Sequence, residues 1–239
     1  MVIDAKHIDF QQLNEALRNT SENCTVTNCL GQRFIAAGMS GKMVTIQGIP
    51  GNALGAYLNG GVIQVMGNAQ DAVGDTMNDG EIIVHGNIGD AAGYAMRGGK
   101  IFVRGNAGYR AGIHMKAYQE KQPVMVIGGK CGSFLGEYQA GGAIVVLGLT
   151  DDPKPIVSRF PGTGMHGGKM FLRSACAGIH FPKQVHARKA ADKDLLEVEA
   201  YIQEFCRHFD FDHGEILNSA FTLVTPDSSN PYHQMYVAN

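Results

Sequence analysis

Glycine recurs at a fixed spacing of 19 residues through the middle of the chain, and this repeat restricts the folds that the chain can adopt. One column of glycines keeps this spacing apart from a single step of 24 residues: Gly48, Gly67, Gly86, Gly105, Gly129 and Gly148. A second column follows seven residues behind the first: Gly55, Gly74, Gly93, Gly112 and Gly136. Self-similarity with a period near 20 residues is typical of a solenoid, in which each repeat stacks on the next.

Apolar residues keep the register of the glycines. They form two columns that are two residues apart: Val44, Ile63, Ile82, Ile101, Met125, Ile144 and Met170, then Ile46, Val65, Val84, Val103, Ile127, Val146 and Leu172. A spacing of two places both columns on the same face of a strand. Each repeat is therefore expected to contribute one short β-strand, with equivalent residues stacked in ladders inside the solenoid.

The high glycine content excludes helices from this region. Glycine makes up 32 of the 239 residues, and each one in a helix interior costs about 1 kcal/mol relative to alanine. The leucine spine of leucine-rich repeats and the nine-residue period of calcium-binding β-rolls are both missing. The expected fold class is all-β: a single-stranded, right-handed parallel β-helix of about seven coils over residues 31–180.

The two ends of the chain lack the repeat and are expected to be helical in part. Residues 1–30 are predicted as an N-terminal helix and lead-in, with the helix over 10–18, where Leu13 and Leu17 lie at helical spacing. Residues 181–239 are predicted as a C-terminal helix and extended tail. An apolar stripe predicts the helix over 192–209, and the tail from Thr225 is expected to be loop or extended chain.

The strand position between the two core columns faces outward, and it becomes apolar from the third coil onward. It is occupied by Thr45, Gln64, Ile83, Phe102, Val126, Val145 and Phe171. An apolar surface of this size must be covered. Two covers remain open at this point: the chain's own C-terminal helix, or a partner protein.

Composition and charge exclude several classes of protein. The net charge of −2 leaves no basic excess for binding a nucleic-acid backbone. No apolar stretch is long enough to span a membrane, and Asp4 and Asp9 interrupt the region where a signal peptide would be apolar. The five cysteines are odd in number, scattered and without a CxxC pair, which argues against disulfides and a zinc site. A cytoplasmic location is therefore expected.

Residues that carry catalytic chemistry are scarce, and no catalytic, cofactor-binding or metal-binding residue is predicted. His114, His166 and His180 stand alone on turns, and Cys131 occupies a column of small core residues. The acidic column that contains Asp71 and Asp90 is compatible with a metal site or with turn hydrogen bonds.

Two insertions break the period, around 116–123 and within 150–165. Insertions in solenoids form loops, often on the binding face. Aromatic and basic side chains there are typical of protein interfaces. The candidate partner interface comprises Lys116, Tyr118, Arg159, Phe160 and His166, and a homo-oligomer is possible.

The repeats resemble a known family. The runs PGNALGAYLNGG, GNAQDAVGDTMNDGEIIVHGNIGDAAGYAMRGGKIFVRGNAGYRAGIHMK and GGKCGSFLGEYQAGG are similar to the GXGXG domain. This domain is the C-terminal β-helix of the glutamate synthase large subunit, and the same repeat occurs in one of the subunits of formylmethanofuran dehydrogenase. The resemblance extends through nearly the whole chain.

The resemblance implies a non-catalytic scaffold subunit of a split glutamate synthase-like complex that serves glutamate biosynthesis. The implied partners are a glutaminase-type amidotransferase subunit and a synthase subunit with FMN and an iron–sulfur cluster. No cofactor is implied in this chain, which starts MVID without the amidotransferase cysteine. The alternatives are an equivalent subunit of formylmethanofuran dehydrogenase or of an N-methylglutamate synthase-type complex, and an independent enzyme or small-molecule-binding protein.

Overall fold

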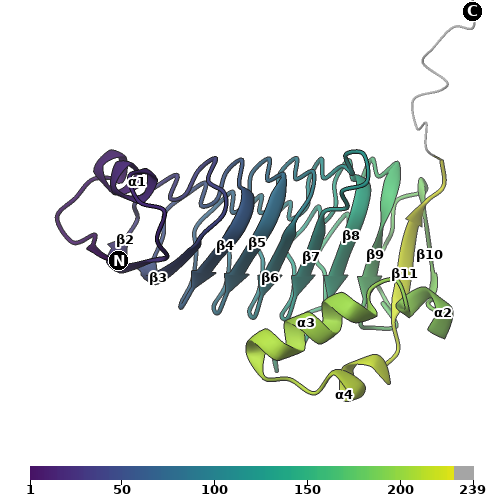
Figure 1. The fold of residues 1–239 in the computed structure, drawn as a ribbon. Helices are drawn as coiled ribbons and strands as arrows, with labels where there is room; N and C mark the ends of the chain where they lie inside the picture. The colour runs from purple at the N-terminus through teal and green to yellow at the C-terminus, as the bar shows by residue number, and fades with distance from the viewer. Residues whose placement is uncertain (229–239) are drawn as a thin grey trace, which may run out of the picture.

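The repeats fold into a parallel β-solenoid, as expected (Figure 1). The computed structural model describes residues 1–228. Eight strands follow one another in chain order and pair in parallel: β2 (Cys24–Leu30), β3 (Met43–Ile49), β4 (Asn59–Val65), β5 (Asp79–Val84), β6 (Lys100–Val103), β7 (Val124–Ile127), β8 (Ala140–Val146) and β9 (Gly167–Leu172). A short strand, β1 (Val2–Asp4), pairs with β2. The stack exceeds the expected seven coils because β2 lies before the first glycine repeat.

The predicted apolar columns form the interior ladders. Ile63, Ile82 and Ile101 pair in register from strand to strand, and all three side chains are fully buried. The core is built from contacts between residues about one repeat apart. The 19-residue period therefore fixes the strand register together with the position of the core.

The second glycine column is required at a corner of each coil. Gly74 has a φ of +68°, and a Cβ atom there would lie 2.6 Å from Cδ1 of Ile101. A side chain at this position would combine left-handed backbone strain with a collision in the core. Glycine therefore lets the chain turn directly over the stacked isoleucines.

Side-chain ladders of Asn and Asp tie successive turns together. The Asn68 side-chain oxygen accepts a hydrogen bond from the Asn87 backbone N–H at 2.8 Å. Asp71 accepts from the Asp90 N–H at 2.9 Å, and Asp90 accepts from the Tyr109 N–H at 2.8 Å. The acidic column therefore provides turn hydrogen bonds, one of the two roles left open by the sequence.

The apolar outer face of the sheet is covered by the chain's own C-terminal helix. Helix α3 (Glu199–Phe209) lies across the strands in Figure 1. One buried cluster unites side chains of the sheet with those of the helix: Ile83, Phe102, Val126, Val145 and Phe171 with Val198, Ile202, Phe205 and Phe209. The first of the two expected covers is thus confirmed.

Helix α1 (Phe10–Arg18) has the expected bounds, whereas the C-terminal helix does not. Asp9 caps α1 and forms a capping box with Gln12. The continuous helix predicted over 192–209 is wrong, because the segment forms α2 (Asp192–Leu195) and α3 with a break at 196–198. The apolar stripe in the sequence extends across the break because Val198, which lies in the turn between the two helices, is also buried.

Specific contacts anchor the short helix α2 before this break. Asp194 receives two hydrogen bonds from Arg188 and one from the Ala191 N–H. The hydrogen bonds from Arg188, followed by that from Ala191, hold the pKa of Asp194 well below its usual range. These contacts fix the start of α2 after Ala191, which takes the N-cap position.

An antiparallel pair closes the sheet at its C-terminal end. Strand β11 (Thr222–Pro226) pairs with β9 on one side and with β10 (Val185–Lys189) on the other. A short helix, α4 (His213–Leu217), connects α3 to β11. The expected tail begins inside β11, and residues 229–239 lie outside the described part. No helix within residues 1–228 is long and apolar enough to cross a membrane.

Candidate functional site

A cleft of about 860 Å³ lies beside the second insertion, at the C-terminal end of the solenoid. One wall comes from the insertion and one from the loop that follows β9, while the floor comes from the turns of the last complete coils. Its principal lining residues are Ala107, Lys130, Cys131, Asp152, Lys154, Pro155, Val157, Arg159, Phe160, Ile179 and His180. The cleft combines apolar lining residues such as Ala107 and Ile179 with charged ones such as Lys154 and Arg159.

Basic side chains outnumber acidic ones in the cleft, although the whole chain carries a net charge of −2. The Lys130 ammonium donates hydrogen bonds to the backbone carbonyls of Asp152 and Lys154 and so holds the insertion in place. The hydrogen bond from the Lys154 N–H lowers the pKa of Asp152, which keeps that carboxylate ionised. Arg159 has no acidic partner among the described residues, so its charge is available to a ligand.

An aromatic pair extends from the cleft over the neighbouring turn. The rings of Phe134 and Phe160 lie 5.3 Å apart between centroids, and Phe160 is 53% exposed. The Arg110 guanidinium lies 5.0 Å from the Phe134 ring, and it also pairs with Glu137 at 2.9 Å. Exposed aromatic rings beside arginine are typical of protein-binding surfaces.

The first insertion folds back onto the turns of earlier coils. Tyr118 and Lys121 exchange two backbone hydrogen bonds, which close a tight turn. The Lys121 ammonium pairs with Asp79 at 2.7 Å and lowers the pKa of that carboxyl. A separate hollow of about 440 Å³ forms here, with Tyr118, Lys121 and Asn78 in its lining.

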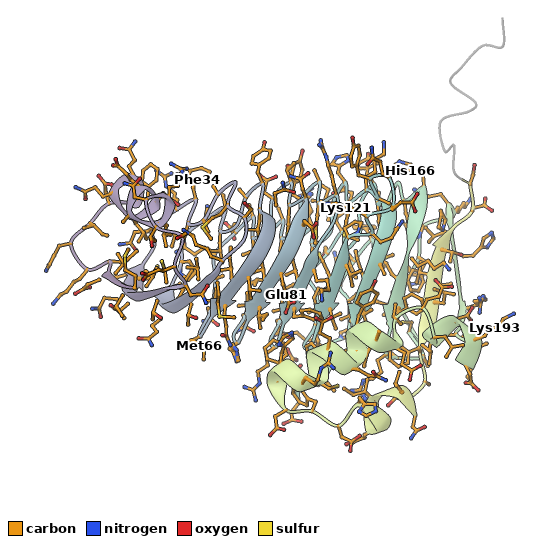
Figure 2. All side chains as sticks on the ribbon, in the orientation of Figure 1. Phe34, Met66, Glu81, Lys121, His166 and Lys193 are labelled. Atoms are coloured by element: carbon orange, nitrogen blue, oxygen red, sulfur yellow. The ribbon has the colours of Figure 1, made fainter. Side chains whose placement is uncertain are left out.

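The structure divides the five predicted interface residues into separate groups. Arg159 and Phe160 meet in the cleft, and Tyr118 lines the second hollow. Lys116 and His166 line neither of these two hollows, and both are outside the buried core. Figure 2 shows Lys121 and His166 along one edge of the solenoid, with Met66 at the opposite edge.

A charged cluster that the sequence did not reveal lies where α3 meets the sheet. Lys100 pairs with Glu204 of α3 and lies 3.5 Å from Glu81, while the His208 ring nitrogen lies 2.8 Å from Glu81. Burial alone would lower the pKa of Lys100, but the hydrogen bond to Glu204 and the charge of Glu81 outweigh it and raise the pKa. Because an ammonium group lies among the carboxylates, the cluster is an ion-pair network that fastens α3.

None of the cysteines is placed to act as a nucleophile. All five are buried and free. Burial raises the pKa of Cys29 to about 11 and raises that of Cys131 further. Among the described histidines, the His114 ring stacks on Tyr138 with ring centroids 5.1 Å apart. Thiolates are the reactive form of cysteine, so the thiols of Cys29 and Cys131 are unreactive core groups.

This burial predicts resistance to thiol reagents. In the folded chain we expect dithionitrobenzoate at pH 8 to label Cys29 and Cys131 only as fast as the protein unfolds. In denaturant all five thiols should react at once. Rapid labelling of Cys131 in the native protein would contradict its assignment to the core.

Comparisons with known proteins agree with the fold. The family described as GXGXG motif matches residues 5–227. The uncharacterized protein MJ1350 of Methanocaldococcus jannaschii is 42% identical over 250 residues, covering 99% of this chain and 96% of the relative. A solved chain from the formyltransferase/hydrolase complex (FhcABCD) of Methylorubrum extorquens, in complex with methylofuran, aligns with a TM-score of 0.61. The two chains are 19% identical, and the alignment covers 84% of this chain and 71% of the solved chain. The comparison therefore shows a similar fold.

Proposed function

This chain belongs to the GXGXG motif family, and from that premise we propose that it is a non-catalytic scaffold subunit of a glutamate synthase-like complex. One observation carries the proposal: the family model matches residues 5–227, and the two insertions that interrupt the repeat carry exposed aromatic and basic groups. A regular solenoid with such insertions offers a rigid body and a recognition surface.

The division of labour follows from the chemistry of the described residues. All five thiols are buried, and burial raises the pKa values of Cys29 and Cys131. A reaction at this assembly then depends on groups from other subunits. We assign those groups to a glutaminase-type amidotransferase and to a synthase that carries FMN and an iron–sulfur cluster.

Affinity purification from the native cell tests this assignment. The tagged chain is recovered at low salt, and the proteins bound in stoichiometric amounts are identified by mass spectrometry. The proposal expects an amidotransferase and a flavin- and iron–sulfur-containing synthase. Recovery of this chain alone, under conditions that keep other multi-subunit enzymes intact, contradicts a scaffold role.

A second assignment is supported by the solved neighbour. Its chain comes from a formyltransferase/hydrolase complex, which favours a formylmethanofuran dehydrogenase-type assembly as the other candidate. The same purification separates the two: formyltransferase or hydrolase subunits in place of an amidotransferase support this second candidate. The identities of the recovered subunits would likewise reveal an N-methylglutamate synthase-type complex.

The isolated chain is expected to be catalytically silent. Purified alone, it should release no ammonia from glutamine and form no glutamate from 2-oxoglutarate, because its described residues offer no activated nucleophile. Its absorbance between 350 and 500 nm should lack a flavin band. A yellow preparation whose colour survives gel filtration would contradict the proposal.

The cleft residues are expected to govern association without affecting folding. Arg159→Ala and Phe160→Ala should each weaken binding to a partner subunit roughly tenfold, as expected for an aromatic or arginine anchor. Both side chains are exposed, so the melting temperature should stay within about 2 °C. Tyr109→Ala is the control, because Tyr109 is 53% exposed outside both insertions. Unchanged affinity for both cleft variants would remove this cleft from the interface.

A further inference from the structure

A ladder of backbone hydrogen bonds follows the turns of the solenoid, outside the strands. The Ala107 N–H donates to the Lys130 carbonyl at 2.9 Å, and the Cys131 N–H donates to the Ile156 carbonyl at 3.0 Å. Each residue of this column before Val157 donates its N–H to a carbonyl of the next coil. The paired residues form one continuous parallel series: Ala69, Ile88, Ala107, Cys131 and Val157.

The ladder stops at Val157 inside the cleft. Among the described residues, the Val157 N–H has no acceptor, although the equivalent N–H of every earlier member has one. The next column stops in the same coil: the Phe134 N–H donates to the Arg159 carbonyl at 2.9 Å, whereas the Phe160 N–H meets no acceptor within residues 1–228. Two backbone donors that the earlier coils pair are therefore left without a partner.

The chain that follows β9 leaves a space where the next coil would lie. Gly178, Ile179 and His180 form the opposite wall of the cleft instead of continuing the ladder. At this end of the solenoid β11 pairs with β9 on the strand side, whereas the turn column that ends at Val157 has no further bridge partner among the described residues. An open ladder edge of this kind accepts an added strand from another chain.

The charges around the open edge determine which kind of added strand is complementary to the cleft. Lys130, Lys154 and Arg159 line the cleft with a single carboxylate, Asp152. Lys154 lies 3.5 Å from that carboxylate, while Arg159 makes no ion pair with any described residue. A segment with acidic side chains is therefore complementary in charge, and its backbone carbonyls match the free donors.

We propose that this cleft binds an extended, acidic segment of a partner subunit, which continues the turn ladder past Val157. The inference rests on the proposed function in one respect, since it takes the segment to belong to another subunit. The chain's own residues 229–239 are a poorer match in charge, because they contain no Asp or Glu. The segment's carbonyls accept from Val157 and Phe160, and its carboxylates pair with Arg159.

The test uses the full chain and a defined probe. A fluorescein-labelled peptide of alternating glutamate and valine is titrated with the chain, and fluorescence anisotropy reports binding. A lysine–valine peptide of equal length is the control probe. We expect binding of the acidic peptide only, weakened by added salt and weakened at least tenfold by Arg159→Glu. Lys6→Glu, an equal change in charge at the other end of the solenoid, should leave the affinity unchanged.

Hydrogen–deuterium exchange over residues 156–161 distinguishes strand addition from diffuse attraction. The acidic peptide should slow exchange of the Val157 and Phe160 amides, since each gains an acceptor. No peptide binding, equal binding of the Arg159→Glu variant, or unchanged exchange would each overturn the proposal. Protection that exists already in the free chain and disappears on removal of 229–239 would overturn it in favour of the chain's own tail. Because these measurements need no partner subunit, their failure leaves the co-purification result unaffected.

Discussion

Replacing Ile82 by alanine is expected to lower the free energy of unfolding by about 2–5 kcal/mol, the range for removing a large buried aliphatic side chain. Ile82 is fully buried and pairs in register with Ile63 and Ile101. Its Cδ1 atom fills the space beside Gly55, where an added Cβ would come within 2.7 Å. Because its ladder partners Ile63 and Ile101 are themselves fully buried, we expect the cavity left by alanine to stay open.

Urea unfolding followed by circular dichroism measures this loss. Met66→Ala is the control from the same part of the solenoid, since Met66 is 49% exposed (Figure 2). It should change the unfolding free energy by no more than about 0.5 kcal/mol. Equal effects of the two substitutions would contradict the assignment of Ile82 to the interior ladder.

The sequence predicts the solenoid well because its important contacts are themselves periodic. Residues such as Ile63 and Ile82 are neighbours in space and one repeat apart in the chain, so the spacing in the sequence records the packing directly. The outward position of Phe102 follows from the same strand alternation, and so does the need for a cover. Fold and register could therefore be predicted from columns of residues alone.

The candidate site was harder to predict because it lies where the period fails. The insertion in the sequence predicts Arg159 and Phe160 as site residues. Lys130 and His180 also line the cleft, but they lie outside the insertion, and no spacing in the sequence relates them to it. The open ladder edge at Val157 consists of unpaired backbone groups, so the side chains in the sequence do not reveal it.

The charged cluster beneath α3 was missed for a related reason. Glu204 and His208 are four residues apart on one helix, but Lys100 and Glu81 come from strands more than a hundred residues earlier in the chain. Only the docking of the helix brings these groups together. Docking of the helix in turn depends on its packing against the apolar outer face of the sheet. The second large expected effect, that of Phe205→Ala, concerns the same packing.

Phe205→Ala is expected to cost about 3–5 kcal/mol of stability in the helix-covered part of the molecule. The Phe205 ring is fully buried between α3 and the sheet, and it contacts Phe209 with centroids 4.8 Å apart. An added Cβ at Gly128 would lie 2.7 Å from the tip of this ring, so the glycine makes room for the phenylalanine. Loss of the ring leaves a cavity over Gly128 that the remaining helix contacts do not fill.

The expected result is a local one, because stability in a solenoid is nearly additive along the stack. Helix α3 should detach at a lower temperature than the coils unfold, which exposes Phe102 and its neighbours and raises the fluorescence of a bound hydrophobic dye. Hydrogen exchange should accelerate first in α3 and later in β3 and β4. Arg207→Ala, an exposed position on the same helix, is the matched control. Uniform destabilisation of all coils by Phe205→Ala would instead mean that the helix is part of one cooperative core, and that the solenoid does not stand without its cover.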